Sequence, residues 1–109
     1  MAKMLINGAR VDAGDGRTID VFNPVDNSLV GTVPMATPED IDRALEASKS
    51  GFHKWKAVPL REKEKIFNRF YQLLEKNRRD ILATLIKESG CSFRGCRRYL
   101  RATWSPPSG

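Results

Sequence analysis

The most reactive side chains in this 109-residue sequence are two cysteines near its C-terminal end, Cys91 and Cys96. A thiolate is a strong nucleophile, and neighbouring arginines can lower a thiol pKa. Two thiols at this spacing, with the single histidine His53 far away in the sequence, fall short of a zinc site. They also do not make a disulfide framework for a cytosolic chain. We therefore interpret both cysteines as ordinary free thiols.

Three further features have residue types that can do chemistry. His53 lies in a predicted helix but outside its apolar positions, and no acid or nucleophile is close to it in sequence. Glu88 is at the end of a predicted helix, where a carboxylate usually makes local hydrogen bonds. The loop Gly14-Asp15-Gly16 lies between predicted strands and opens no helix, so it does not have the form of a phosphate-binding loop. The sequence therefore predicts no catalytic residue.

The positive charge of the chain is concentrated after residue 90. The net charge is +6, and residues 91–109 contain no carboxylate. The basic residues in that segment are Arg94, Arg97, Arg98 and Arg101. Because this charge has one sign only and the sequence ends in Ser-Pro-Pro-Ser-Gly, which cannot be helical, we expect a disordered tail.

This basic tail offers one binding hypothesis. Its arginines are interleaved with Phe93, Tyr99 and Trp104, which resembles a weak segment for phosphate contact and base stacking. Four charges would give only salt-sensitive, non-specific binding. We favour an incidental basic end and do not expect nucleic acid as a partner.

The first third of the sequence predicts short strands. Asn7-Gly8 tolerates the positive φ angles of a type I′ turn, so Met4 to Val11 is expected to form a hairpin. Thr18 to Phe22 and Leu29 to Val33 are rich in β-branched and apolar residues and predict two more strands. Pro34 ends the second of these, because proline cannot donate to a strand ladder.

Helices follow the strands. Thr37 is expected to cap a helix that has Pro38 at its first position and ends before Pro59. A second helical stretch begins near Leu60, with a break near Asn77 and a stop at Gly90. The connection between the two stretches is short, so we expect an antiparallel helix pair.

The predicted elements do not complete a core. The apolar face of the second helical stretch is wider than one partner helix can cover, so another part of a protein is expected to lie against it. Its members are Ile66, Phe67, Phe70, Leu73, Leu74, Ile81, Leu82, Leu85 and Ile86. Strands followed by helices, with no later strand, predict an incomplete α/β arrangement.

The composition limits the cellular locations that we expect for the protein. Apolar residues make up 40% and charged residues 29%, and no apolar run approaches the roughly 20 residues of a membrane-spanning helix. The apolar stretch Met4 to Ile6 is shorter than the core of a signal peptide, which has about 7–15 residues. We therefore expect a cytoplasmic protein with no membrane partner.

The order of several weak motifs resembles the N-terminal segment of the NAD(P)-dependent aldehyde dehydrogenase superfamily. The resemblance covers residues 4–90. The motifs, in order, are Leu5-Ile6-Asn7-Gly8, Val21-Phe22-Asn23-Pro24, Val30-Gly31-Thr32-Val33-Pro34, Thr37-Pro38-Glu39-Asp40, Phe52-His53-Lys54-Trp55 and Lys87-Glu88-Ser89-Gly90. Each is common alone, and their sequence and spacing together indicate the family.

The resemblance implies what the whole enzyme does. Family members have a Rossmann-like cofactor domain and oxidise an aldehyde to a carboxylic acid with NAD or NADP, through a cysteine thiohemiacetal that a glutamate-activated water hydrolyses. The family's catalytic cysteine, its glutamate, its cofactor loop and its oxyanion-hole asparagine have no counterparts in this sequence. The fragment is therefore expected to bind no cofactor. In some members, backbone before the Asn-Pro motif helps to hold a monovalent cation, which implicates Asp20 or Val21.

The resemblance also divides the chain. Residues 1–90 are expected to be the N-terminal part of the family's NAD(P)-binding domain, and residues 91–109 a divergent basic tail produced by a frameshift or premature stop. The leading interpretation is a truncated aldehyde dehydrogenase that is inactive alone. The alternative is an interaction module whose exposed helical face docks on a full-length homologue or on the missing remainder of the enzyme.

Overall fold

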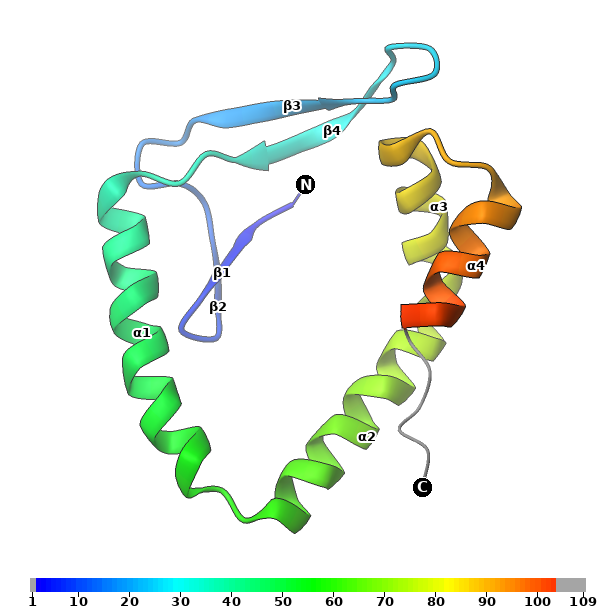
Figure 1. The fold of residues 1–109 in the computed structure, drawn as a ribbon. Helices are drawn as coiled ribbons and strands as arrows, with labels where there is room; N and C mark the ends of the chain where they lie inside the picture. Colours follow the sequence, from blue (N-terminus) through cyan, green and yellow to red (C-terminus); the bar gives the residue numbers. More distant parts are fainter. Residues whose placement is uncertain (1, 104–109) are drawn as a thin grey trace. The chain divides into compact units, whose positions relative to one another are not determined.

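The computed structural model describes residues 2–103 (Figure 1). These residues form two compact units, which are described separately. The first unit contains residues 2–22 and 29–58, and the second contains residues 23–28 and 59–103. None of the helices in residues 2–103 is long and apolar enough to cross a membrane.

The first unit begins with the expected hairpin. Strands β1 (Met4–Ile6) and β2 (Ala9–Val11) pair antiparallel, with Ile6 opposite Ala9. The two turn residues have positive φ angles, 51° at Asn7 and 77° at Gly8. This is the type I′ geometry that the Asn-Gly pair predicts, so the hairpin is confirmed.

A second antiparallel pair follows, formed by β3 (Thr18–Phe22) and β4 (Leu29–Pro34). Phe22 lies opposite Leu29, but Val21 lies opposite Gly31, so the register shifts and one extra residue, Val30, is accommodated in β4. Such a bulge increases the local twist of a strand pair. Both predicted strands are confirmed.

Helix α1 (Pro38–Ala57) completes the first unit. The Thr37 side chain accepts the Asp40 N–H at 3.1 Å, and the Asp40 carboxylate accepts the Thr37 N–H at 2.9 Å. This reciprocal capping box satisfies N–H groups that the first turn leaves without helical partners. The predicted start of the helix, with Pro38 in the first turn, is therefore confirmed.

The apolar positions of α1 remain largely exposed to solvent. Ile41 is 50% exposed, Leu45 63% and Phe52 61%. Within the described part of the first unit, the buried residues are Ala13 and Asp40, one of which is charged. The first unit therefore has almost no apolar core of its own.

The second unit contains two consecutive helices, α2 (Leu60–Lys76) and α3 (Arg78–Ser89). They are separated at Asn77, whose side chain donates to the Leu73 carbonyl at 2.8 Å. The predicted break at Asn77 and the predicted stop at Gly90 are both confirmed. The antiparallel packing expected for the first two helical stretches stays a prediction, because α1 and α2 belong to different units.

A small apolar core lies where α3 meets the last helix, α4 (Phe93–Thr103), next to it in Figure 1. Cys96 and Leu100 of α4 are 1% and 3% exposed, and they cluster with Leu82 of α3. The prediction of a disordered tail is wrong for Phe93–Thr103. Cys96 and Leu100 are four residues apart on one face of a helix, and burying that face stabilises α4. Residues 104–109 lie outside the described residues.

The fold class is confirmed as an incomplete α/β arrangement. Residues 2–103 contain four helices and two separate two-stranded antiparallel sheets. Helix α2 has no buried residue. The apolar face that the sequence predicts for α2 is thus present and uncovered within the described residues.

Candidate functional site

The predicted cation ligands, Asp20 and Val21, lie in the middle of β3. Asp20 is exposed and lies opposite Thr32, whereas Val21 is half-buried and lies opposite Gly31, beside the bulge at Val30. The described residues contain no cluster of three or more histidine, cysteine or acidic side chains that could hold a metal ion. A site here would therefore depend on backbone carbonyls, as the resemblance implies, and it stays a prediction.

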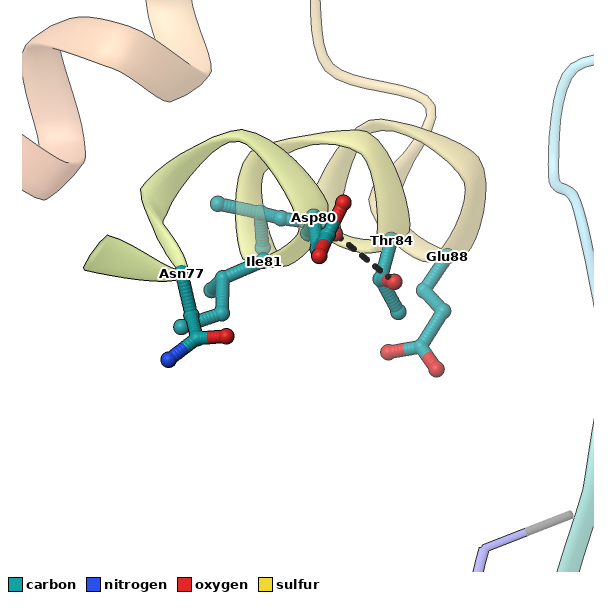
Figure 2. A pocket seen from close by; sticks show the side chains of 6 residues that line it. Asn77, Asp80, Ile81, Thr84 and Glu88 are labelled. Carbon is teal, nitrogen blue, oxygen red and sulfur yellow. Dashed lines mark hydrogen bonds between the residues drawn. The ribbon is translucent and has the colours of Figure 1, made fainter. Parts of the chain in front are cut away.

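The other two candidates, His53 and Glu88, lie on different helices, α1 and α3. His53 is exposed on α1, with its ring edge-on to Phe52 at a centroid distance of 5.5 Å. Glu88 lies on α3 along an open hollow of about 420 Å³ that Figure 2 shows from close by. Its neighbours along the hollow are Asn77, Asp80, Ile81, Thr84 and Leu85.

The hollow on α3 does not have the geometry of a catalytic site. Glu88 and Asp80 are two helical turns apart, a rise of about 12 Å, which is too far for the two carboxylates to share a proton. Thr84, which lies between them, donates its hydroxyl to the Asp80 carbonyl at 3.1 Å (Figure 2). The hydroxyl is thus engaged with the backbone of its own helix, and no acid, base and nucleophile come together.

The two cysteines do come together, but the surroundings of Cys91 do not activate its thiol. Cys96 is buried, and its Sγ lies 3.8 Å from the Ser89 Oγ, which also accepts the Cys91 N–H at 3.2 Å. A hydrogen bond with the Cys96 thiol, together with burial, raises the pKa of the Cys91 thiol. A nucleophilic cysteine needs the opposite shift. The interpretation of both as ordinary thiols therefore has a physical basis.

The charged group with the most unusual surroundings is Asp40. Its carboxylate is 1% exposed, accepts the N–H groups of Thr37 and Gly14 at 2.9 Å each, and forms an ion pair with Arg43. The N–H donors of Thr37 and then Gly14, with Arg43, hold the pKa of this carboxyl well below its usual range. Asp40 thereby fastens the loop at Gly14 to the start of α1, which is a structural role.

The hydrogen bonds of the loop Gly14-Asp15-Gly16 determine whether this loop can bind the pyrophosphate of a dinucleotide. A dinucleotide pyrophosphate is held by free backbone N–H groups at a helix N-terminus beside a glycine loop. Here the Gly14 N–H donates to Asp40, the Gly16 N–H donates to the Ala13 carbonyl at 2.9 Å, and Thr37 caps α1. The loop and the start of α1 therefore do not fit a pyrophosphate.

One long-range contact in the second unit joins the turn at residues 23–28 to the end of α3. Gly90 has a left-handed φ of 67°, and its N–H donates to the Ile86 carbonyl at 3.0 Å. A Cβ atom at Gly90 would lie 2.8 Å from Pro24 Cγ and 3.0 Å from Val25 Cγ2. Two of the motifs that carried the family resemblance, Asn-Pro and Ser-Gly, therefore meet in space, although 66 positions separate Pro24 from Gly90.

The fold in residues 2–103 is a partial α/β arrangement of four helices and two small antiparallel sheets. The model of the aldehyde dehydrogenase family matches residues 11–104, so the chain belongs to that family. The match continues past Gly90, where the resemblance was expected to end. The chain corresponds to an N-terminal segment of the superfamily.

Curated relatives give the same result. Vanillin dehydrogenase of Corynebacterium glutamicum is 39% identical over 88 residues, which cover 81% of this chain and 18% of the relative. D-glyceraldehyde dehydrogenase (NADP(+)) of Thermoplasma acidophilum is 34% identical over 88 residues, with the same coverage. The chain thus spans about one fifth of the length of the curated relatives it matches.

Solved structures agree with the sequence comparison. An aldehyde dehydrogenase from Brucella melitensis biovar abortus superposes on 96% of this chain with a TM-score of 0.90 and 32% identity. A NAD-dependent benzaldehyde dehydrogenase from Corynebacterium glutamicum superposes on 94% with a TM-score of 0.87 and 33% identity. In both cases the chain covers 22% of the solved structure.

Proposed function

We propose that this chain is a scaffold segment of an aldehyde dehydrogenase and is inactive alone. The whole enzyme oxidises an aldehyde to a carboxylic acid with NAD or NADP, and the remainder of that enzyme supplies the catalytic cysteine, the glutamate and the cofactor loop. The observation that carries this proposal is the family match over residues 11–104, on a chain that spans about one fifth of its relatives.

The exposed face of α2 supports a scaffold role. Ile66, Phe70 and Leu73 are 50%, 56% and 46% exposed, and they lie on one side of the helix. Apolar side chains gathered in this way usually mark a surface that another part of a protein covers. In this proposal the remainder of the enzyme covers the α2 face, and the segment in turn supports that remainder.

Complementation tests the proposal. A vanillin dehydrogenase of Corynebacterium glutamicum from which the matching segment has been deleted is mixed with this chain, and NAD(P)H formation from vanillin is followed. We expect no activity from either piece alone and measurable activity from the mixture. Activity of this chain alone, with any aldehyde, contradicts the proposal.

A matched pair of variants identifies the surface involved. Phe70→Asp places a carboxylate on the exposed apolar face of α2, and Asn68→Asp adds the same charge at an exposed position about 200° away around the helix. We expect Phe70→Asp to abolish complementation and Asn68→Asp to preserve it. Equal behaviour of the two variants shows that the α2 face is not the contact.

The same exposed face favours a second candidate function, an interaction module that docks on a full-length relative. Analytical ultracentrifugation of this chain with an intact aldehyde dehydrogenase separates the two. Co-sedimentation that Phe70→Asp removes supports docking, whereas complementation without co-sedimentation supports the scaffold segment. The cytoplasmic location expected from the sequence stays a prediction.

A further inference from the structure

Helix α4 gathers four arginines on one face. Their positions follow the spacing of three, four and seven residues that aligns side chains along a helix. Together they line a surface hollow of about 210 Å³, and the residues that line it are Arg94, Arg97, Arg98 and Arg101. The basic segment that we interpret from the sequence alone as an incidental tail therefore contains a helix with arginines along one face.

The opposite face of α4 holds the row in place. Cys96 and Leu100, which are almost fully buried, pack with Leu82 of α3. The Ser92 hydroxyl accepts the Gly95 N–H at 3.1 Å and so satisfies a donor in the first turn. The arginines thus project from an anchored helix, so less backbone freedom is lost when they meet a ligand.

Three arginines of this row, Arg94, Arg97 and Arg98, form no ion pair with a carboxylate within residues 2–103. Several other arginines of the chain pair with a carboxylate close in sequence, as Arg43 does with Asp40 and Arg17 with Asp15. The sequence also has no acidic residue after Glu88. The face is therefore a concentrated positive surface.

We propose that the arginine face of α4 binds the phosphodiester backbone of a nucleic acid duplex, a function that is separate from the aldehyde dehydrogenase assignment and does not rest on it. The row rises about 10 Å from Arg94 to Arg101, and a duplex carries one phosphate per roughly 1.7 Å of its axis. Each guanidinium therefore has a phosphate within reach, and its planar fork matches phosphate oxygens.

Two observations favour a duplex over other polyanions. A helix that binds a lipid surface inserts its apolar face, but the apolar face of α4 is already packed on α3. Single-strand binding stacks successive bases on several aromatic side chains beside the charged groove. Of the two aromatic residues in Phe93–Thr103, only Phe93 lies beside the row, because Tyr99 is about 140° around the helix from Arg94. Contacts to phosphates alone carry no base sequence, so the binding is independent of sequence.

The salt dependence of binding tests the proposal quantitatively. Fluorescence anisotropy of a short labelled DNA duplex of mixed sequence is measured with the full chain. Phosphate contacts by Arg94, Arg97 and Arg98 predict a slope of about −2.7 for the logarithm of affinity against the logarithm of salt, which is roughly a 40-fold loss of affinity between about 50 and 200 mM salt. A second duplex of scrambled sequence is expected to bind equally well.

Variants assign the binding to α4. Arg97→Gln with Arg98→Gln removes two of these three contacts and lowers the slope to about −0.9, so the same change of salt costs only about 3.5-fold. Arg61→Gln with Arg69→Gln removes the same charge from exposed positions of α2 and is expected to leave the slope unchanged. Arg97→Lys with Arg98→Lys retains the charges and therefore the slope.

Three results overturn the proposal. The first is the absence of duplex binding by the native chain at low salt. The second is an equal reduction of slope by the α4 pair and the α2 pair, which assigns the effect to net charge. The third is arginine-dependent binding to phosphatidylserine vesicles without binding to the duplex, which assigns the face to membranes. Circular dichroism of each variant confirms that its helix content equals that of the native chain.

Discussion

Replacing Gly90 by alanine tests the contact between the turn at residues 23–28 and the end of α3. The left-handed φ of 67° costs a residue with a Cβ about 1–2 kcal/mol. The new methyl group would also lie 2.8 Å from the Pro24 ring, well inside ordinary contact distance. Overpacking of this kind costs about 1–3 kcal/mol.

An effect in the unfolded chain partly offsets the energy costs of the left-handed φ and of the overpacking. Alanine has less conformational freedom than glycine there, which favours folding by about 0.4–1 kcal/mol. The net expected loss is about 1–4.6 kcal/mol of local stability. Because about 1.4 kcal/mol is a factor of ten in an equilibrium constant, amides in the last turn of α3 should exchange with deuterium roughly 5 to 2000 times faster.

Hydrogen–deuterium exchange measured by mass spectrometry provides the assay, because it reports residues 23–28 and the end of α3 separately. Gly16→Ala is the matched control, since Gly16 has a φ of 73° but no atom within 4 Å of its Cβ position. Gly16→Ala introduces the same backbone strain without a close contact, so it should lower the free energy of unfolding by about 1 kcal/mol.

The close contact can also be tested by a substitution at Pro24, the residue that the new methyl group would meet. Pro24→Ala removes the nearest atom, so in its background the substitution at Gly90 should cost less than it does alone, as a double-mutant cycle measures. Additive effects at Pro24 and Gly90, or unchanged exchange in Gly90→Ala, refute the inferred contact.

Three further predictions concern other groups. Leu100→Ala opens the small core and should cost about 2–5 kcal/mol, which circular dichroism detects as loss of the α4 contribution; unchanged helix content shows that α4 does not depend on this core. The pKa of Asp40 is lowered chiefly by the Thr37 N–H, so its stabilising contribution is present above the ordinary carboxyl range and is lost as the pH falls below about 4. Acid titration should therefore reduce helix content less in Asp40→Asn than in the native chain, and equal curves contradict this. Cys91 should alkylate faster than buried Cys96, with a rate that keeps rising at pH values above the ordinary thiol pKa, because the pKa of Cys91 is raised; a rate that levels off near neutral pH contradicts it.

The parts of the fold that could be predicted depend on short-range signals. Asn7-Gly8 determines a turn because it tolerates positive φ, and Thr37 with Asp40 determines a helix start through bonds within one turn. Gly90 ends α3 for the same kind of reason. Each of these signals is complete within a few residues, so the sequence alone predicts the element.

The sequence could not predict contacts between distant residues. The bond from Gly14 to the Asp40 carboxylate spans 26 positions, and no local pattern distinguishes it from a loop amide exposed to water. The contact of Pro24 with Gly90 is of the same kind. The family resemblance rests in part on the Asn-Pro and Ser-Gly motifs but does not explain why both occur. The contact between Pro24 and Gly90 gives a physical reason.

Helix α4 shows a different source of error. Its four arginines dominated the composition of the segment, and like charges along one face argue against an isolated helix. The two residues that stabilise it, Cys96 and Leu100, are few and are paired with α3 through tertiary packing. Tertiary burial outweighed local propensity, so a prediction from composition alone was wrong.

Thermal unfolding of the isolated chain, followed by calorimetry, tests the central claim most directly. If α1 and α2 present apolar faces that the remainder of an aldehyde dehydrogenase covers, the chain alone should unfold over a broad range with little heat. A complete domain of this size absorbs about 70 kcal/mol in one sharp transition. A single cooperative transition of that enthalpy, in a monomer, contradicts the account of an incomplete segment.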